Sequence, residues 1–195
     1  MELIRNINPF DVELSTARLL LRRVKESDDN DMFEYTSDHG ITKFLSWNPH
    51  TDITQTKRYI DKVIAQYDQT DCYAWAIELQ ERRKLIGIVR IFDVSTYNKR
   101  GELSFIVNPS FQGQGLALEA ISAIFGFCFN KAGLNRIQAK CAPENYSSAK
   151  LMQNLGMKYE GTLKQFWIKK ETFTDAKIYS IVAEDYRKLL SERML

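Results

Sequence analysis

The sequence of 195 residues predicts a mixed α and β fold. Strand-like and helix-like segments alternate along it, and no Pro-, Gly- or Ser-rich linker and no internal repeat separates them. Hydrophobic residues make up 44% of the chain and charged residues 27%, which is typical of a globular protein with a buried core. A chain of this length most often forms one domain, so residues 1–195 are expected to fold as a single unit.

The first half of the chain predicts a strand, two helices and a hairpin. Alternating apolar residues indicate strands, whereas apolar residues three or four apart indicate helices. The expected elements are a strand at 18–24, a helix beginning at 27–29, a helix within 52–67, and a hairpin of strands 74–79 and 85–91. Between the two helices, residues 43–50 mix aromatic, polar and Pro residues, which is typical of loops that determine specificity.

The second half contains a strand, loop, helix and strand unit. The glycine-containing loop at 112–115 lies between an apolar strand and an apolar helix, and Gly133 is the expected stop of that helix. The expected elements are a strand at 102–108, a helix from 116 to about 131, a strand at 136–141, a short helix capped by Asn145, and strands at 166–168 and 178–182.

Charge and cysteine content exclude several classes of function. With 27 basic and 25 acidic residues the net charge is +2, so nucleic acid and anionic membranes are not expected as partners. Cys72, Cys128 and Cys141 lack disulfide spacing, and Met1–Arg5 lacks the apolar run of a signal peptide, which together favour a cytoplasmic location. The only two histidines have no ligand-spaced partners, so no metal is expected.

The loop Gln112–Ala117 carries the clearest chemical signal. Its two glycines let the backbone approach an anion, and its N–H groups and the positive end of the following helix dipole favour a phosphate. A Walker P-loop would need a Lys-Ser/Thr pair where Leu116 and Ala117 stand. A dinucleotide fold would need a third glycine and an acidic residue about 20 positions on, where basic residues stand instead.

The pattern Gln112-x-x-Gly115-x-Ala117 resembles the acetyl-CoA motif of the GNAT superfamily, and Asn145-x-x-Ser148 resembles its second cofactor contact. Thr16–Arg22, Glu119-Ala120 and further short matches up to Ala183 resemble the ribosomal-protein-alanine N-acetyltransferase branch. The resemblance implies a GNAT fold: a mostly antiparallel mixed sheet whose two central parallel strands splay apart, with helices on both faces. It also implies acetyl-CoA as the co-substrate, and it is compatible with a homodimer.

The resemblance further implies roles for individual residues. Backbone N–H groups of the loop would hold the pyrophosphate, and the exposed strand edge would pair with pantetheine as an added strand. An N–H near Val107 could polarise the thioester carbonyl. Asn145 would bond pantetheine, and Ser148 would protonate the leaving thiolate. The implied cofactor-binding residues are Phe105, Ile106, Val107, Gln112, Gly113, Gln114, Gly115, Leu116, Ala117, Asn145 and Ser148.

The sequence leaves alternatives for two catalytic groups, the general acid and the general base. Many GNAT enzymes use a tyrosine as general acid where Met152 stands, a departure shared by the resembled branch, which has the Ser148-type residue. Glu102 is the preferred general base because period-two alternation places it on one strand face with Ser104 and Ile106. Water is the alternative. Weaker candidates are Glu160, Glu171 and Asp175, and the candidates for the 3'-phosphate of CoA are Arg136, Lys140 and Lys150.

Three functions therefore follow as hypotheses. The first is transfer of acetyl to the N-terminal α-amine of a protein, and the second is transfer to a small amine such as a polyamine, amino acid or antibiotic. The third is a catalytically silent acyl-CoA-binding module. Trp47 and His50 are the expected acceptor-binding residues, because they lie in the loop 43–50.

Overall fold

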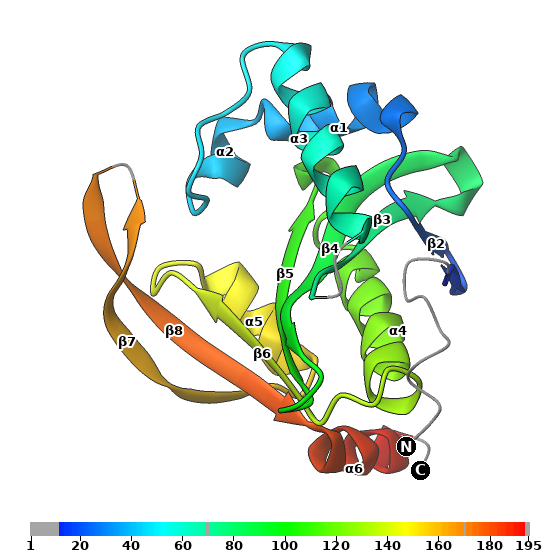
Figure 1. The fold of residues 1–195 in the computed structure, drawn as a ribbon, viewed down its shortest axis with the longest axis vertical. Helices are drawn as coiled ribbons and strands as arrows, with labels where there is room; N and C mark the ends of the chain where they lie inside the picture. The colour runs from blue at the N-terminus through cyan, green and yellow to red at the C-terminus, as the bar shows by residue number, and fades with distance from the viewer. Residues whose placement is uncertain (1–11, 69–70, 170, 194–195) are drawn as a thin grey trace.

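The computed structural model describes residues 12–68, 71–169 and 171–193, and its core is one eight-stranded sheet in the order β1-β2-β3-β4-β5-β6-β8-β7 (Figure 1). The strands are β1 (Leu14–Ser15), β2 (Leu19–Arg22), β3 (Tyr73–Leu79), β4 (Lys84–Ser95), β5 (Arg100–Val107), β6 (Arg136–Cys141), β7 (Lys158–Lys169) and β8 (Thr172–Val182). Among these strands the neighbours are antiparallel, except for the central pair β5 and β6.

Within the described ranges, six α-helices lie around this sheet. They are α1 (Asp29–Thr36), α2 (His39–Thr42), α3 (Ile53–Ala65), α4 (Leu116–Asn130), α5 (Tyr146–Asn154) and α6 (Ala183–Arg193). Side-chain caps fix where three of them begin, and at α2 the Asp38 carboxylate accepts the N–H of Ile41 at 3.0 Å. The Asp52 carboxylate accepts the N–H of Thr54 at 2.7 Å, and the Asn145 amide oxygen accepts the N–H of Ser148 at 3.2 Å.

Helices cover both faces of the sheet. Trp75 and Val89 are cross-strand partners on one face, and the Trp75 ring meets Phe127 of α4 with centroids 5.8 Å apart. Arg90 follows Val89 and so faces the opposite side, where it donates to Gln66 at the end of α3. Fully buried apolar side chains from both faces form one continuous core. The expected mixed fold with helices on both faces is confirmed.

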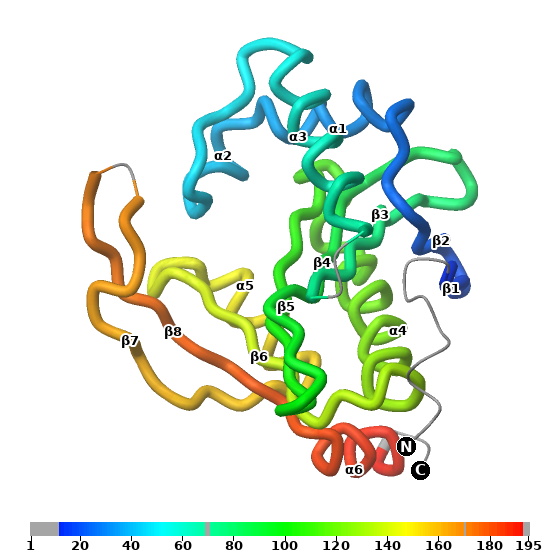
Figure 2. The backbone as a smooth tube through the Cα atoms, in the orientation of Figure 1, coloured from blue at the N-terminus to red at the C-terminus, as the bar shows by residue number. Residues whose placement is uncertain are grey.

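The two parallel strands pair only over their first four residues. The register runs from Arg100 opposite Arg136 to Leu103 opposite Ala139, although β5 continues to Val107 and β6 to Cys141. Figure 2 shows the two strands leaving each other beyond this point, β5 towards α1 and β6 towards α5. The expected splay is therefore confirmed, and it leaves one edge of β5 without a strand partner.

Several elements are longer than the sequence patterns indicate or have no clear pattern. Strands β7 and β8 form a hairpin of 12 and 11 residues, where only 166–168 and 178–182 are expected. Most β7 side chains are exposed, so the strand lacks the alternation that marks a half-buried strand. Strand β1 and helices α2 and α6 are also missed, because they are short or mostly polar.

Close approach of two backbones requires a glycine at position 87. A Cβ there would overlap the carbonyl oxygen of Ile106 and lie 3.1 Å from Cα of Val107. We expect Gly87→Ala to lower the free energy of unfolding by about 1–3 kcal/mol, as overpacking does, in urea denaturation. Gly126→Ala is the control, since outside its own helix its Cβ would meet only the Tyr186 hydroxyl, at 3.3 Å and not in overlap. Equal stability of both variants would contradict this expectation.

Candidate active site

The loop between β5 and α4 has the geometry of an anion-binding site. Gly113 and Gly115 have φ of 74° and 75°, a region that favours glycine, and α4 begins directly after them. Among the described residues, no N–H from Gly113 to Leu118 donates to a protein acceptor. These N–H groups and the helix dipole are therefore free to act on a bound anion.

The glycines also leave room for that anion. A Cβ at Gly113 would meet nothing within 4 Å, and one at Gly115 would meet only Nη2 of Arg18 at 3.6 Å. Two side chains of the loop stabilise its conformation by hydrogen bonds to backbone carbonyls. Gln112 Nε2 donates to the Val107 carbonyl at 2.9 Å, and Gln114 Nε2 donates to the Ser110 carbonyl at 3.1 Å. The residues present thus fit a pyrophosphate bound by main-chain N–H groups.

The unpaired edge of β5 continues from this loop into the splay. Asn108 donates its N–H to the Ile86 carbonyl at 2.8 Å, so its backbone faces β4. Because backbone direction alternates along a strand, Val107 and Phe105 present their N–H groups to the splay instead. This edge can accept an extended pantetheine chain, and an N–H here can bind the oxyanion of an acyl transfer.

Asn145 and Ser148 lie at the start of α5. The Asn145 amide oxygen accepts from the Ser148 N–H and from Ser147 Oγ at 3.0 Å, so this residue caps the helix as the sequence predicts. Ser148 is half-buried, and within the described residues its hydroxyl has no hydrogen-bond partner. Met152 is fully buried in the core. Ser148 therefore remains the candidate acid on this helix.

We expect Ser148→Ala to lower kcat about 10-fold without changing the Kd for acetyl-CoA, because only protonation of the leaving thiolate is affected. Stopped-flow release of CoA thiol and calorimetry measure the two quantities. Ser147→Ala is the matched control, since Ser147 is an exposed serine one residue away that bonds only the cap. An unaltered kcat in Ser148→Ala would remove this residue from the mechanism.

Glu102 lies in the paired part of β5, close to the point where β5 and β6 part. It is 7% exposed, and its carboxylate accepts from Gln138 Nε2 at 3.1 Å and forms an ion pair with Lys140 of β6. Nζ of Lys140 also lies 4.7 Å from the ring centre of Phe166 on β7. Glu102 is thus a buried, fixed carboxylate beside the splay and not a solvated strand end.

Four other charged candidates form hydrogen bonds or ion pairs with protein groups: Glu160, Asp175, Arg136 and Lys140. Glu160 accepts from Arg136 at 2.7 Å, and this hydrogen bond lowers the pKa of Glu160 to about 2, which makes it a poor proton acceptor. Asp175 accepts from the Gln165 N–H and from Lys164, which lowers its pKa. Arg136 and Lys140 each form an ion pair with a carboxylate, so binding of the 3'-phosphate would compete with that pair.

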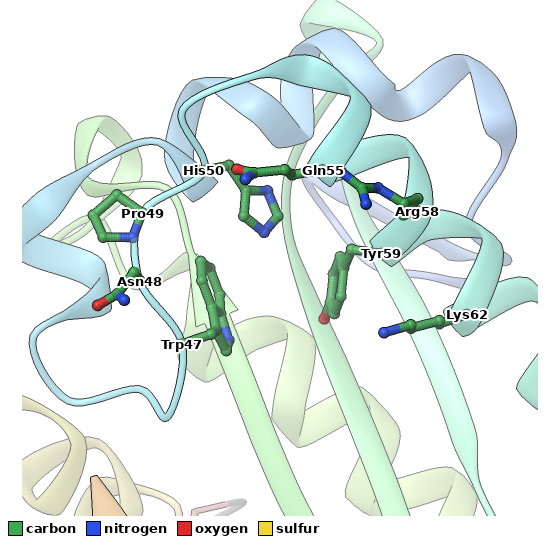
Figure 3. Close-up of a pocket in the computed structure, with 8 residues that line it drawn as sticks. All are labelled: Trp47, Asn48, Pro49, His50, Gln55, Arg58, Tyr59 and Lys62. Carbon is green, nitrogen blue, oxygen red and sulfur yellow. The ribbon is translucent and has the colours of Figure 1, made fainter. Parts of the chain in front are cut away.

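Trp47 and His50, the two expected acceptor residues, line one pocket of about 470 Å³ (Figure 3). Their ring centres are 4.9 Å apart, and Tyr59 of α3 lies 6.4 Å from each. His50 Nδ1 bonds Thr56 Oγ1 at 2.8 Å, and burial lowers the pKa of His50, so its ring is neutral near pH 7. The remaining lining residues are Asn48, Pro49, Gln55, Arg58 and Lys62.

The β7–β8 hairpin reaches the segment that carries this pocket. Nζ of Lys169 donates to the Phe44 carbonyl at 2.6 Å and lies 4.5 Å from the ring centre of Trp167. In Figure 1 the upper parts of β7 and β8 lie to the left of α5, and α2 lies above it. Segments far apart in the sequence therefore surround the point where β5 and β6 part.

Two features are absent from the described ranges. No helix there is long and apolar enough to cross a bilayer. Three or more His, Cys, Asp or Glu side chains that could hold a metal ion are not found together there.

Comparison with known proteins identifies the family. Residues 18–158 match the model of the acetyltransferase (GNAT) domain. The uncharacterized N-acetyltransferase YnaD of Bacillus subtilis is 30% identical over 90% of this chain and 99% of its own. The [ribosomal protein uS5]-alanine N-acetyltransferase of Escherichia coli is 23% identical over 90% and 93%.

A solved structure extends this likeness to the whole architecture. The GNAT-family acetyltransferase of Bacillus anthracis superimposes with a TM-score of 0.79 at 26% identity, over 89% of this chain and 99% of that one. The glycine loop and the splayed strands lie within the matched region. The chain therefore belongs to the GNAT family and is an acetyl-CoA-dependent N-acetyltransferase.

Proposed function

We propose that the acceptor is the N-terminal α-amine of a protein. The observation that carries this proposal is the composition of the pocket around Trp47 and His50. Three aromatic rings and two cations line it, and none of its eight described lining residues has a carboxylate. A polyamine or aminoglycoside carries several positive charges, which this lining would repel. A peptide N-terminus carries one charge, and it must lose that charge before it attacks.

The reaction needs little help from a base with such an acceptor. An α-amine has a pKa near ~8, against ~10.4 for lysine, so a substantial fraction is neutral near pH 7. Acetyl-CoA supplies the activated acyl group. In the proposed step the amine nitrogen bonds the acyl carbon while the C–S bond breaks. The backbone N–H near Val107 binds the developing oxyanion, Glu102 or water takes the amine proton, and Ser148 protonates the thiolate.

The hairpin supports a peptide acceptor as well. Phe166, Ile168 and Phe173 expose 44%, 64% and 61% of their surfaces near the tip of β7 and β8. Apolar side chains beside the splay would contact the residues that follow a peptide N-terminus. Similarity to the uS5-alanine enzyme is consistent with this acceptor.

The test is release of CoA thiol from acetyl-CoA with a panel of N-terminal peptides, spermidine, amino acids and aminoglycosides. We expect turnover with peptides that is lost when their N-terminus is blocked. Preferential turnover of spermidine or an aminoglycoside would establish the small-amine alternative, and tight CoA binding without any release would support the silent module. A homodimer, with which the family resemblance is compatible, is the assembly we propose, and light scattering of the purified chain measures it.

A further inference from the structure

A guanidinium from the far edge of the sheet lies against the glycine loop. Arg18 stands between β1 and β2, about 100 positions before the loop, and its side chain is 47% exposed. Its Nη1 donates to the Gln114 carbonyl at 3.0 Å, and its Nη2 lies 3.6 Å from the position of a Cβ on Gly115. Arg18 therefore contacts the main chain of the loop at its two last residues before α4.

Glu119, in the first turn of α4, holds this guanidinium in place. Its Oε2 accepts from Arg18 Nε at 2.7 Å and pairs with Nη2 at 2.6 Å. Its Oε1 accepts from the Arg18 N–H at 3.0 Å and from Thr16 Oγ1 at 2.6 Å. Burial alone would raise the pKa of Glu119, but the hydrogen bonds from Thr16 and Arg18 outweigh it and lower the pKa. The carboxylate is ionised and fixed near pH 7.

The bond to Gln114 controls the direction of one peptide group. The carbonyl of Gln114 and the N–H of Gly115 belong to the same planar unit and point in opposite directions. Glycine at 115 lets this plane rotate at little steric cost, since glycine occupies both signs of φ. If the plane turned over, a carbonyl dipole would replace an N–H in the site and repel a phosphate. Arg18 holds the carbonyl, so the N–H stays on the other side.

We propose that Arg18, held by Glu119, is a positioning residue for acetyl-CoA that fixes the peptide between Gln114 and Gly115 with its N–H towards the pyrophosphate. This proposal rests on the assignment of the glycine loop as the phosphate site. It assigns Arg18 to the loop and not to the phosphate, because three of the five N–H groups of its guanidinium, one on each nitrogen, are already bound by Gln114 and Glu119. The energetic gain is pre-organisation of a loop that binds with its backbone.

Calorimetry with CoA on Arg18→Ala tests the proposal. We expect Kd to rise about 10-fold, the effect of losing one charge-assisted hydrogen bond. The paired variant Arg18→Ala with Glu119→Ala separates positioning from charge, because it restores the net charge. We expect it to bind CoA as weakly as Arg18→Ala alone. Wild-type affinity in the paired variant would show that the loss came only from the unmasked Glu119 carboxylate, and would overturn the proposal.

A second readout excludes a general structural effect. S-acetylpantetheine lacks the pyrophosphate, so kcat/KM with this donor should stay at the wild-type value in Arg18→Ala, while kcat/KM with acetyl-CoA falls about 10-fold. Equal loss with both donors would contradict the proposal. Lys158→Ala, which loses a surface ion pair with Asp185, is the matched control. If Gly115→Asp binds CoA with wild-type affinity, the assignment of the loop as the phosphate site fails. If Gly115→Asp loses affinity for CoA but Arg18→Ala keeps the wild-type affinity, only the role of Arg18 is refuted.

Discussion

Gly115→Asp is expected to raise the Kd for acetyl-CoA at least about 100-fold, because it places a carboxylate where the pyrophosphate should lie. Gly115 is the last residue before α4, with φ of 75°, and the nearest atom to its Cβ position is Nη2 of Arg18 at 3.6 Å. A carboxylate there would occupy the free N–H groups of the helix start and repel the cofactor's phosphates. Arg18 would offset little of this charge, since its guanidinium is already paired with Glu119.

Gly115→Asn is the matched control for this variant. Asn has nearly the same size as Asp and tolerates a positive φ equally well, but it carries no charge. We expect Gly115→Asn to lose no more than about 10-fold in affinity. Titration calorimetry with acetyl-CoA measures both, and thermal melting shows that both are folded. An unchanged affinity in Gly115→Asp would refute the loop as the phosphate site.

The sequence predicts the geometry of the glycine loop before α4 better than any other part of the candidate site, for a physical reason. A glycine loop between a strand and a helix works through local backbone geometry, so the residues at 112–117 contain the whole signal. The cap at Asn145 is equally local, because the amide bonds a group three positions away. The splay of β5 and β6 follows from the family resemblance and not from the pattern of either strand.

Contacts between distant strands are not predictable from one sequence. The ion pair of Glu102 with Lys140 depends on the register of a parallel pair, which no local pattern specifies. For this reason the sequence offers Lys140 only as a candidate for the 3'-phosphate and does not indicate its ion pair with Glu102. The bond from Arg18 to Gln114 spans 96 positions and was not foreseen at all. Arg18 is a functional candidate that only the folded chain identifies.

Glu102→Gln is expected to lower kcat about 100-fold with little change in the Kd for acetyl-CoA. Glu102 is a buried carboxylate at the point where β5 and β6 part, and glutamine keeps its shape but cannot take a proton. The variant leaves Lys140 without its counter-charge, so a loss of stability is also expected. The paired variant with Lys140→Met removes that unpaired charge, and we expect it to regain stability but not turnover.

Glu160→Gln provides the matched control for the chemistry. Glu160 belongs to the neighbouring hairpin, and its hydrogen bond with Arg136 lowers its pKa to about 2, so it has little capacity to accept a proton near pH 7. We expect Glu160→Gln to keep the wild-type kcat in the CoA-thiol assay, with only a modest loss of stability. If Glu102→Gln also turns over at the wild-type rate while folded, water accepts the amine proton. In that case the enzyme works through the oxyanion-binding N–H and the orientation of a neutral α-amine alone, and Glu102 serves to hold β6 beside β5 at the splay.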